Sequence, residues 1–146
     1  MTTYVDGSAV LERIVAGEGS DVAAEVWRRA RTVASSAIAY PEARGLLARA
    51  HDQGELGDHD MHEAAGALER VFADLELVAV DADLAVTAGG LAEQHGLEAL
   101  DALHLAAALS LDATRVVVAT WSPSLAAAAS ECGLAIVPRQ PARAAA

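Results

Sequence analysis

In the mostly apolar stretch of residues 97–109, Asp101 and His104 are polar residues that could do chemistry. The stretch consists largely of strong helix formers without Gly or Pro, and a spacing of three puts both side chains on one face of a helix. Burying a carboxylate in apolar surroundings costs free energy unless a cation or hydrogen-bond donors contact it. Two explanations are open for Asp101. Either a neighbouring Arg or backbone N–H groups compensate it, or it shares a divalent metal ion with other carboxylates.

Two more acids stand at positions where such a site could form. Asp6 follows the short β-type run at residues 2–5, and ligands of open α/β sheets bind at the carboxyl ends of the strands. The alternative for Asp6 is that it only caps the following helix. Glu42 comes directly after Pro41, which is expected to kink or restart a helix there. Glu42 is then either a surface acid in a first helical turn or the second member of a carboxylate site.

Strands and helices alternate along the whole chain, so these acids belong to an α/β domain with a mainly parallel sheet. A single domain is expected over residues 1–138, followed by a frayed tail at residues 139–146. Strands are expected at residues 2–5, 32–35, 75–80, 115–119 and 134–137.

Several residues indicate where the helices begin and end. Asp81 or Asp83 can cap one helix, and Gly96 ends it. Ser36 is expected to begin the helix that carries Glu42, and Ser122 can cap the helix that follows the fourth strand. With these boundaries, Asp6, Glu42 and Asp101 are predicted to reach the same carboxyl edge of the sheet.

Composition excludes several classes of function. The chain has 146 residues, a formal net charge of −11 and ten Arg without any Lys, which argues against a simple nucleic-acid binder and rules out a P-loop. Cys132 is alone, so no disulfide framework exists. Neither a leader at residues 1–14 nor a membrane-spanning run is visible, so a cytoplasmic protein is expected. The cluster of Arg28, Arg29 and Arg31 is either a solvated basic surface or a phosphate contact.

The remaining polar clusters are interpreted as surface features. Asp58, His59 and His62 have no spacing that specifies a metal geometry. His51 and His95 fall near expected helix ends and should face solvent.

Four segments together resemble the PIN-domain ribonucleases, and among them the VapC toxins of bacterial toxin–antitoxin pairs. The resemblance extends over almost the whole chain and implies a three-layer α/β/α PIN-like domain with a mainly parallel central sheet. It also implies an endoribonuclease, dependent on Mg²⁺ or Mn²⁺, that hydrolyses RNA phosphodiester bonds. The segments that carry the resemblance are residues 4–9, 35–44, 100–106 and 118–123.

The resemblance implies that Asp6, Glu42 and Asp101 are the catalytic metal ligands, with Ser8 and Ser122 able to contact the ion through water. The residue types agree, because hard divalent cations prefer oxygen ligands and Mg²⁺ keeps several waters. A water made more acidic by the ion would attack phosphorus, so no protein nucleophile is required.

Three positions depart from the family pattern. Ser122 stands where many relatives carry a fourth acid, which implies a weaker second metal position, a single-metal site or lost activity. Ser122 is therefore open between a helix cap and a site residue. Gly7 replaces a Thr or Ser and is expected to affect only the loop. Glu98 replaces a basic residue and removes one candidate RNA contact.

The resemblance also implies partners, namely an RNA substrate, a cognate antitoxin protein and a second copy of the chain in a homodimer. The rival interpretation is a catalytically silent PIN domain that binds RNA or a protein, with Ser122 as the mark of lost activity. A phosphatase or dehalogenase with Asp6 as nucleophile is disfavoured, since it would require an acid at Ser8 and a Lys.

Overall fold

The structure, a computed structural model, describes residues 1–139 and contains a five-stranded parallel sheet with the strand order β3-β2-β1-β4-β5. The parallel sheet confirms the expected fold class. Of the predicted tail, residues 140–146 lie outside the described residues. The strands are β1 (Thr2–Val5), β2 (Thr32–Ser36), β3 (Glu76–Val78), β4 (Val116–Ala119) and β5 (Ala135–Val137).

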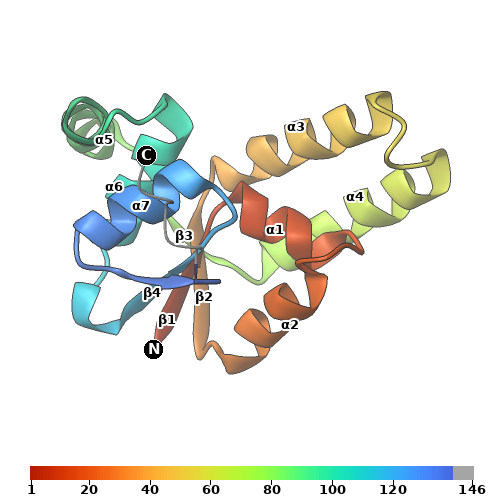
Figure 1. Cartoon of the computed structure of the whole chain (residues 1–146), viewed down its shortest axis with the longest axis horizontal. Helices are drawn as coiled ribbons and strands as arrows, with labels where there is room; N and C mark the ends of the chain where they lie inside the picture. The colour runs from red at the N-terminus through yellow and green to blue at the C-terminus, as the bar shows by residue number, and fades with distance from the viewer. Residues whose placement is uncertain (140–146) are drawn as a thin grey trace, which may run out of the picture.

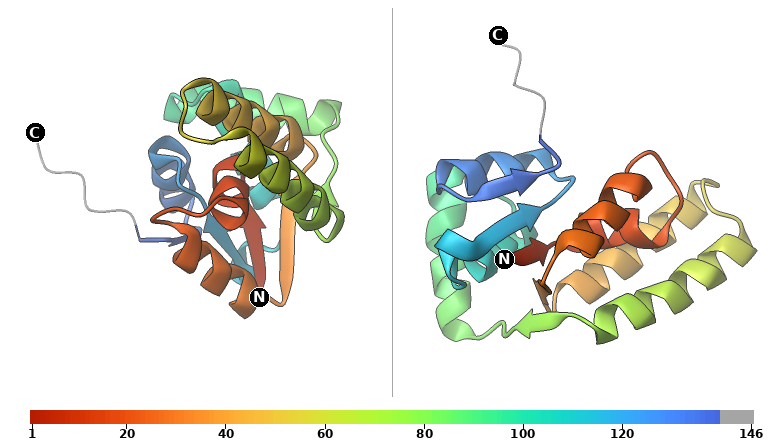
Figure 2. Two further views of the ribbon diagram at one scale, coloured as in Figure 1. Left: turned by 90° about the vertical axis from the view of Figure 1, so that its right-hand side faces the viewer. Right: turned by 90° about the horizontal axis from the view of Figure 1, so that it is seen from below.

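Helices cover both faces of the sheet, which gives three layers (Figures 1 and 2). Helices α6 and α7 pack on one face, with α5 against α6, while α1, α3 and α4 form the core on the other face, with α2 beside α1. No helix within residues 1–139 is long and apolar enough to cross a membrane. The helices are α1 (Gly7–Ile14), α2 (Ser20–Arg29), α3 (Ala39–Asp52), α4 (Asp58–Ala73), α5 (Ala82–His95), α6 (Ala99–Leu109), the short 3₁₀ helix η1 (Ala113–Arg115) and α7 (Pro123–Glu131).

Successive residues of β1 belong to the two hydrophobic cores on opposite faces of the sheet. Tyr4 is buried against α6 and α7, and its neighbour Val5 is buried against α1, α3 and α4. This alternation follows from the two-residue period of a strand. Strand β4 contributes to both cores in the same way, as expected for an apolar strand covered on both faces.

The strand order creates a switch point between β1 and β4. From β1 the chain adds β2 and β3 on one side, then returns to add β4 and β5 on the other. Val5 and Ala119 are partners in the register, so the chain leaves both strands side by side. Asp6 and Thr120 follow directly, at the position where ligands of such sheets bind.

Most of the predicted helix ends are confirmed. The Asp81 side chain accepts from the backbone N–H of Leu84 at 2.9 Å, and Gly96 ends α5 in the left-handed conformation with φ 64°. Ser122 caps α7. The prediction that Ser36 begins a helix was wrong, because Ser36 ends β2 and α3 begins only at Ala39.

The predicted kink or restart of a helix at Pro41 was also wrong, because α3 begins at Ala39. Pro41 is the third residue of a continuous α3, where a backbone N–H would have no partner within the helix in any case. The predicted position of Glu42 in the first turn is confirmed.

His95 does not face solvent as expected. Its side chain is only 7% exposed, and its Nδ1 lies 2.8 Å from Oε2 of Glu131. The other ring nitrogen lies 3.5 Å from Sγ of Cys132. His51 is 38% exposed and pairs with Asp58 at 2.7 Å, closer to the expectation.

Candidate active site

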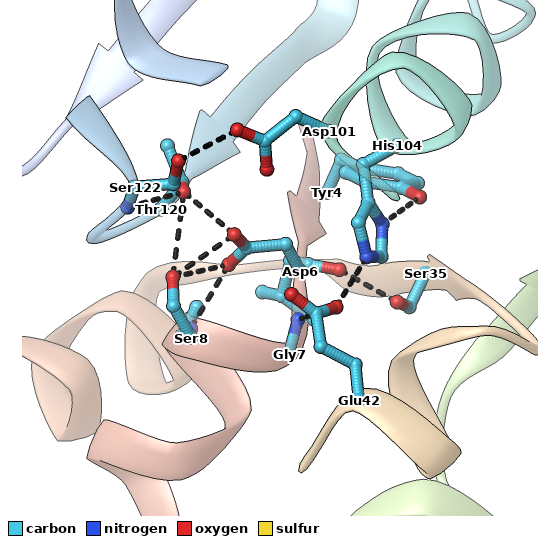
Figure 3. A network of polar contacts seen from close by, with 12 residues as sticks. Tyr4, Asp6, Gly7, Ser8, Ser35, Glu42, Asp101, His104, Thr120 and Ser122 are labelled. Carbon is cyan, nitrogen blue, oxygen red and sulfur yellow. Dashed lines mark hydrogen bonds and ion pairs between the residues drawn. The ribbon is translucent and has the colours of Figure 1, made fainter. Parts of the chain in front are cut away.

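Asp6 lies at the centre of a polar network at the carboxyl edge of the sheet (Figure 3). Its side chain is fully buried. Ser8 Oγ lies 2.7 Å from Oδ1 and 2.9 Å from Oδ2, and the Thr120 hydroxyl donates to Oδ2 at 2.7 Å. The backbone N–H of Ala9 donates to Oδ1 at 2.9 Å, so Asp6 does cap α1. Both oxygens of this acid are therefore held.

The surroundings of Asp6 disfavour its charge. Burial raises the pKa of the carboxyl group. The positive charge that His104 can carry and the donors from Ala9, Thr120 and Ser8 act in the opposite direction without cancelling the effect. Further positive charge at this position would stabilise the ionised form.

Glu42 is held by one oxygen only. Its Oε2 accepts from the backbone N–H of Gly7 at 2.9 Å and lies 2.6 Å from Nε2 of His104. A Cβ atom at position 7 would lie 2.5 Å from Cδ of Glu42. The expectation that Gly7 affects only the loop was therefore wrong, because the missing side chain leaves room for the Glu42 carboxylate.

Asp101 is compensated by two hydroxyl groups rather than by an Arg or by backbone N–H groups. Oδ2 of Asp101 accepts from Ser122 at 2.9 Å and from Ser124 at 2.6 Å. Ser122 Oγ also lies 3.4 Å from the backbone N–H of Leu125, as a cap of α7. Ser122 thus caps α7 and also contacts Asp101, while its contact to an ion through water stays a prediction.

The end of β4 connects these acids. Thr120 Oγ1, which donates to Asp6, accepts from the backbone N–H of Ser122 at 3.0 Å. The backbone N–H of Trp121 donates to Ser8 Oγ at 2.8 Å. Asp6 and Asp101 therefore belong to one hydrogen-bonded network, and Glu42 joins it through Gly7, the residue after Asp6.

The donors leave two carboxylate oxygens open. Within residues 1–139, Oε1 of Glu42 and Oδ1 of Asp101 accept no hydrogen bond, and no ion pair joins an Arg to Asp6, Glu42 or Asp101. In the same part of the chain, no three Asp, Glu, His or Cys side chains have the spacing of a metal site as they stand. The donor set of carboxylates and hydroxyls nevertheless fits a hard cation that keeps several waters.

Several residues of this network had no role in the sequence prediction. The sequence marks His104 as a polar residue in an apolar helix but indicates no partner for it. Thr120 belongs to the motif at residues 118–123, and Tyr4 to that at residues 4–9. Ser124 carried no signal, since a Ser near a helix start is common.

Comparison with known proteins agrees with the fold. A family model described as PIN domain matches residues 3–120. The chain is 34% identical over 137 residues to Ribonuclease VapC45 of Mycobacterium tuberculosis, covering 94% of this chain and 95% of that protein. It is 33% identical over 135 residues to Ribonuclease VapC46 of the same species, covering 92% and 95%. The crystal structure of M. tuberculosis VapC20, described as a Sarcin-Ricin loop cleaving toxin, has a similar fold, with a TM-score of 0.68, 21% identity and coverage of 95% of this chain and 99% of that one.

Proposed function

The chain belongs to the PIN-domain family and, within it, to the ribonucleases named VapC, and we propose that it cleaves RNA with a divalent cation held by Asp6, Glu42 and Asp101. Mg²⁺ or Mn²⁺ is the proposed ion. The reaction is hydrolysis of a phosphodiester bond within an RNA chain.

One observation carries this proposal. Three acids, one directly after β1 and the others in α3 and α6, belong to one network, and within residues 1–139 two of them each keep one oxygen without a protein donor. The described residues offer no Arg to these acids. An oxygen-rich site that lacks its own cation is the arrangement in which a hard divalent ion binds.

The chain's own side chains orient the acids. Ser8 of α1 and Thr120, which directly follows β4, hold Asp6, while Ser122 holds Asp101. When bound, the ion supplies Lewis-acid activation of water and positive charge that offsets the substrate phosphate. Ser8 donates its proton to Asp6 and accepts from Trp121, so its hydroxyl acts as a support and not as a nucleophile.

Ser122 limits how much charge the site can hold. A fourth acid would add a ligand beside Asp101, whereas the Ser122 hydroxyl is neutral and already donates to Asp101. We infer that the site takes one divalent ion rather than two.

The proposal includes partners. An antitoxin protein would inhibit the enzyme by inserting an Arg whose guanidinium meets the open oxygens of Glu42 and Asp101, since Arg and carboxylates form strong charge-assisted pairs. A homodimer of the domain at residues 1–138 is part of the same proposal, and its support is membership of the family.

The test compares RNA cleavage by the full chain with that by matched variants. A panel of RNAs is incubated with Mg²⁺ or Mn²⁺ and either the unaltered protein, Asp101→Asn, or Glu25→Gln as a surface control. Cleavage by the unaltered protein and the control, but not by Asp101→Asn, is expected. Absence of cleavage by the unaltered protein with both ions would favour the silent PIN domain.

A further inference from the structure

His104 is a buried residue that the cleavage chemistry has not used. It lies on α6 one turn after Asp101 and is fully buried, yet both ring nitrogens have partners. Nδ1 lies 2.8 Å from the hydroxyl oxygen of Tyr4, and Nε2 lies 2.6 Å from Oε2 of Glu42. The Tyr4 and His104 rings meet edge to face with centroids 5.8 Å apart. The imidazole is therefore fixed at both ends.

The directions of these bonds follow from the partners. An ionised carboxylate only accepts hydrogen bonds, so the hydrogen between His104 and Glu42 is on Nε2. With that hydrogen on Nε2, Nδ1 of the neutral imidazole is an acceptor, and the Tyr4 hydroxyl at 2.8 Å can donate to it. Tyr4 thus holds His104 in the tautomer that donates to Glu42.

We propose that His104 is a positioning residue for Glu42, fixing Oε2 so that Oε1 is the oxygen presented to the divalent cation. The proposal rests on the function proposed above and adds a role for a residue that itself contacts neither ion nor RNA. It also makes Tyr4 a support for His104.

The contacts of Glu42 support this role. Its side chain is only 14% exposed, and Oε2 is held from two sides, by His104 of α6 and by the backbone of Gly7 in α1. Gly7 has no side chain to displace the carboxylate. A long, flexible Glu side chain would otherwise lose rotamer freedom on binding the ion, and prior fixation removes that cost.

Helix α6 then serves two of the three acids. It carries Asp101 directly and reaches Glu42 through His104, one turn later. Residues that hydrogen-bond to metal ligands orient those ligands in this way. Mutation of such a residue typically weakens metal affinity about 10- to 100-fold.

The test measures Mn²⁺ affinity of the full chain by calorimetry without RNA. His104→Leu, which has no donor, should bind Mn²⁺ at least about tenfold more weakly, while His104→Gln, whose amide can donate to Glu42, should stay within about threefold of the unaltered protein. Tyr4→Phe, which keeps the ring and loses the hydroxyl, should bind about threefold more weakly. His95→Leu and Tyr40→Phe are matched controls outside the network and should bind as the unaltered protein does.

The outcomes separate the two proposals. If the unaltered protein binds no Mn²⁺, the proposed metal site is wrong. If it binds Mn²⁺ and folded His104→Leu binds equally well, only the positioning role is wrong. Equal weakening in His104→Leu and His104→Gln would overturn it as well, since it would reveal a packing effect. If His104→Leu does not fold, Tyr4→Phe decides, and unchanged affinity in that variant would contradict the proposal.

Discussion

Acids are compensated in opposite ways on the surface of α2 and at the carboxyl edge of the sheet. Glu25 on α2 binds Arg28 through two hydrogen bonds of 2.6 and 2.8 Å and also contacts Arg29. These bonds, with that of Arg28 the largest cause, lower the pKa of Glu25 to about 2. Within residues 1–139, in contrast, Asp6 accepts only from neutral donors and has one His nearby, and burial raises its pKa.

Within residues 1–139, the Arg residues that form ion pairs do so with exposed acids, and none pairs with Asp6, Glu42 or Asp101. Exposed ion pairs contribute little to folding, since water and salt screen them. Burying an acid without a cation beside it lowers the folding stability. Proteins retain such acids where function requires their charge. We therefore interpret the carboxyl edge as a site whose positive charge comes from outside the chain.

The largest expected effect is on the rate of RNA cleavage, when one acid in each region is replaced by its neutral amide. Asp101→Asn keeps an oxygen that can accept from Ser122 and Ser124 but removes the charge. RNA cleavage should fall on the order of 1,000-fold, as for loss of one preorganised group that stabilises charge. Glu25→Gln should leave the rate unchanged. Equal rates for Asp101→Asn and the unaltered protein would show that the two regions do not differ in function.

Adding an acid to the edge should sharpen the contrast. Ser122→Asp places a carboxylate beside Asp101 and keeps a favourable cap for α7. Mn²⁺ affinity measured by calorimetry should increase about tenfold, consistent with another oxygen ligand of the ion. The matched variant Ser130→Asp, at the far end of α7, should leave affinity unchanged. An unchanged affinity in Ser122→Asp would remove position 122 from the metal site.

The dependence of stability on pH should differ between the regions when metal is removed by a chelator. The pKa of Asp6 is raised above its ordinary value of 3.8, so the stability linked to its proton is present below that value and is lost as pH rises through the raised pKa. Asp6→Asn has no such loss. Its melting temperature should therefore decline less than that of the unaltered protein between about pH 4 and pH 7. Parallel curves for the two proteins would contradict the assigned environment.

The smallest effect is expected on α2. Arg28→Ala and Arg29→Ala remove exposed ion pairs, so the melting temperature should not change measurably. Cleavage kinetics in the same variants test the other interpretation of this basic cluster. A KM that is higher in the variants and depends less steeply on salt than in the unaltered protein would identify it as a phosphate contact.

Local features of the fold could be predicted because their contacts are close in sequence. Asp81 binds the backbone three residues later, Gly96 ends a helix that it directly follows, and Glu42 lies in a first turn next to Pro41. The order of strand and helix signals was sufficient to bring Asp6 to the carboxyl edge. Ser36 failed because a Ser that can cap a helix can also end a strand.

The partners of the acids could not be predicted, because they come from distant parts of the chain. Tyr4 and His104 are 100 positions apart, and Asp6 and Thr120 are 114 positions apart. Nothing in the sequence around His104 indicates its partners Tyr4 and Glu42, which contact it because folding brings β1 and α3 to α6. Likewise, nothing in the sequence near Asp101 indicated that two Ser hydroxyls from the start of α7 would hold it.

The most direct test is the anomalous scattering of Mn²⁺ in crystals of the unaltered protein. The account predicts one peak at the carboxyl edge, within coordination distance of oxygens of Asp6, Glu42 and Asp101 or of waters bound to them. A fully occupied peak elsewhere with none at this edge, or Mn²⁺-dependent RNA cleavage by the same preparation without such a peak, would contradict it.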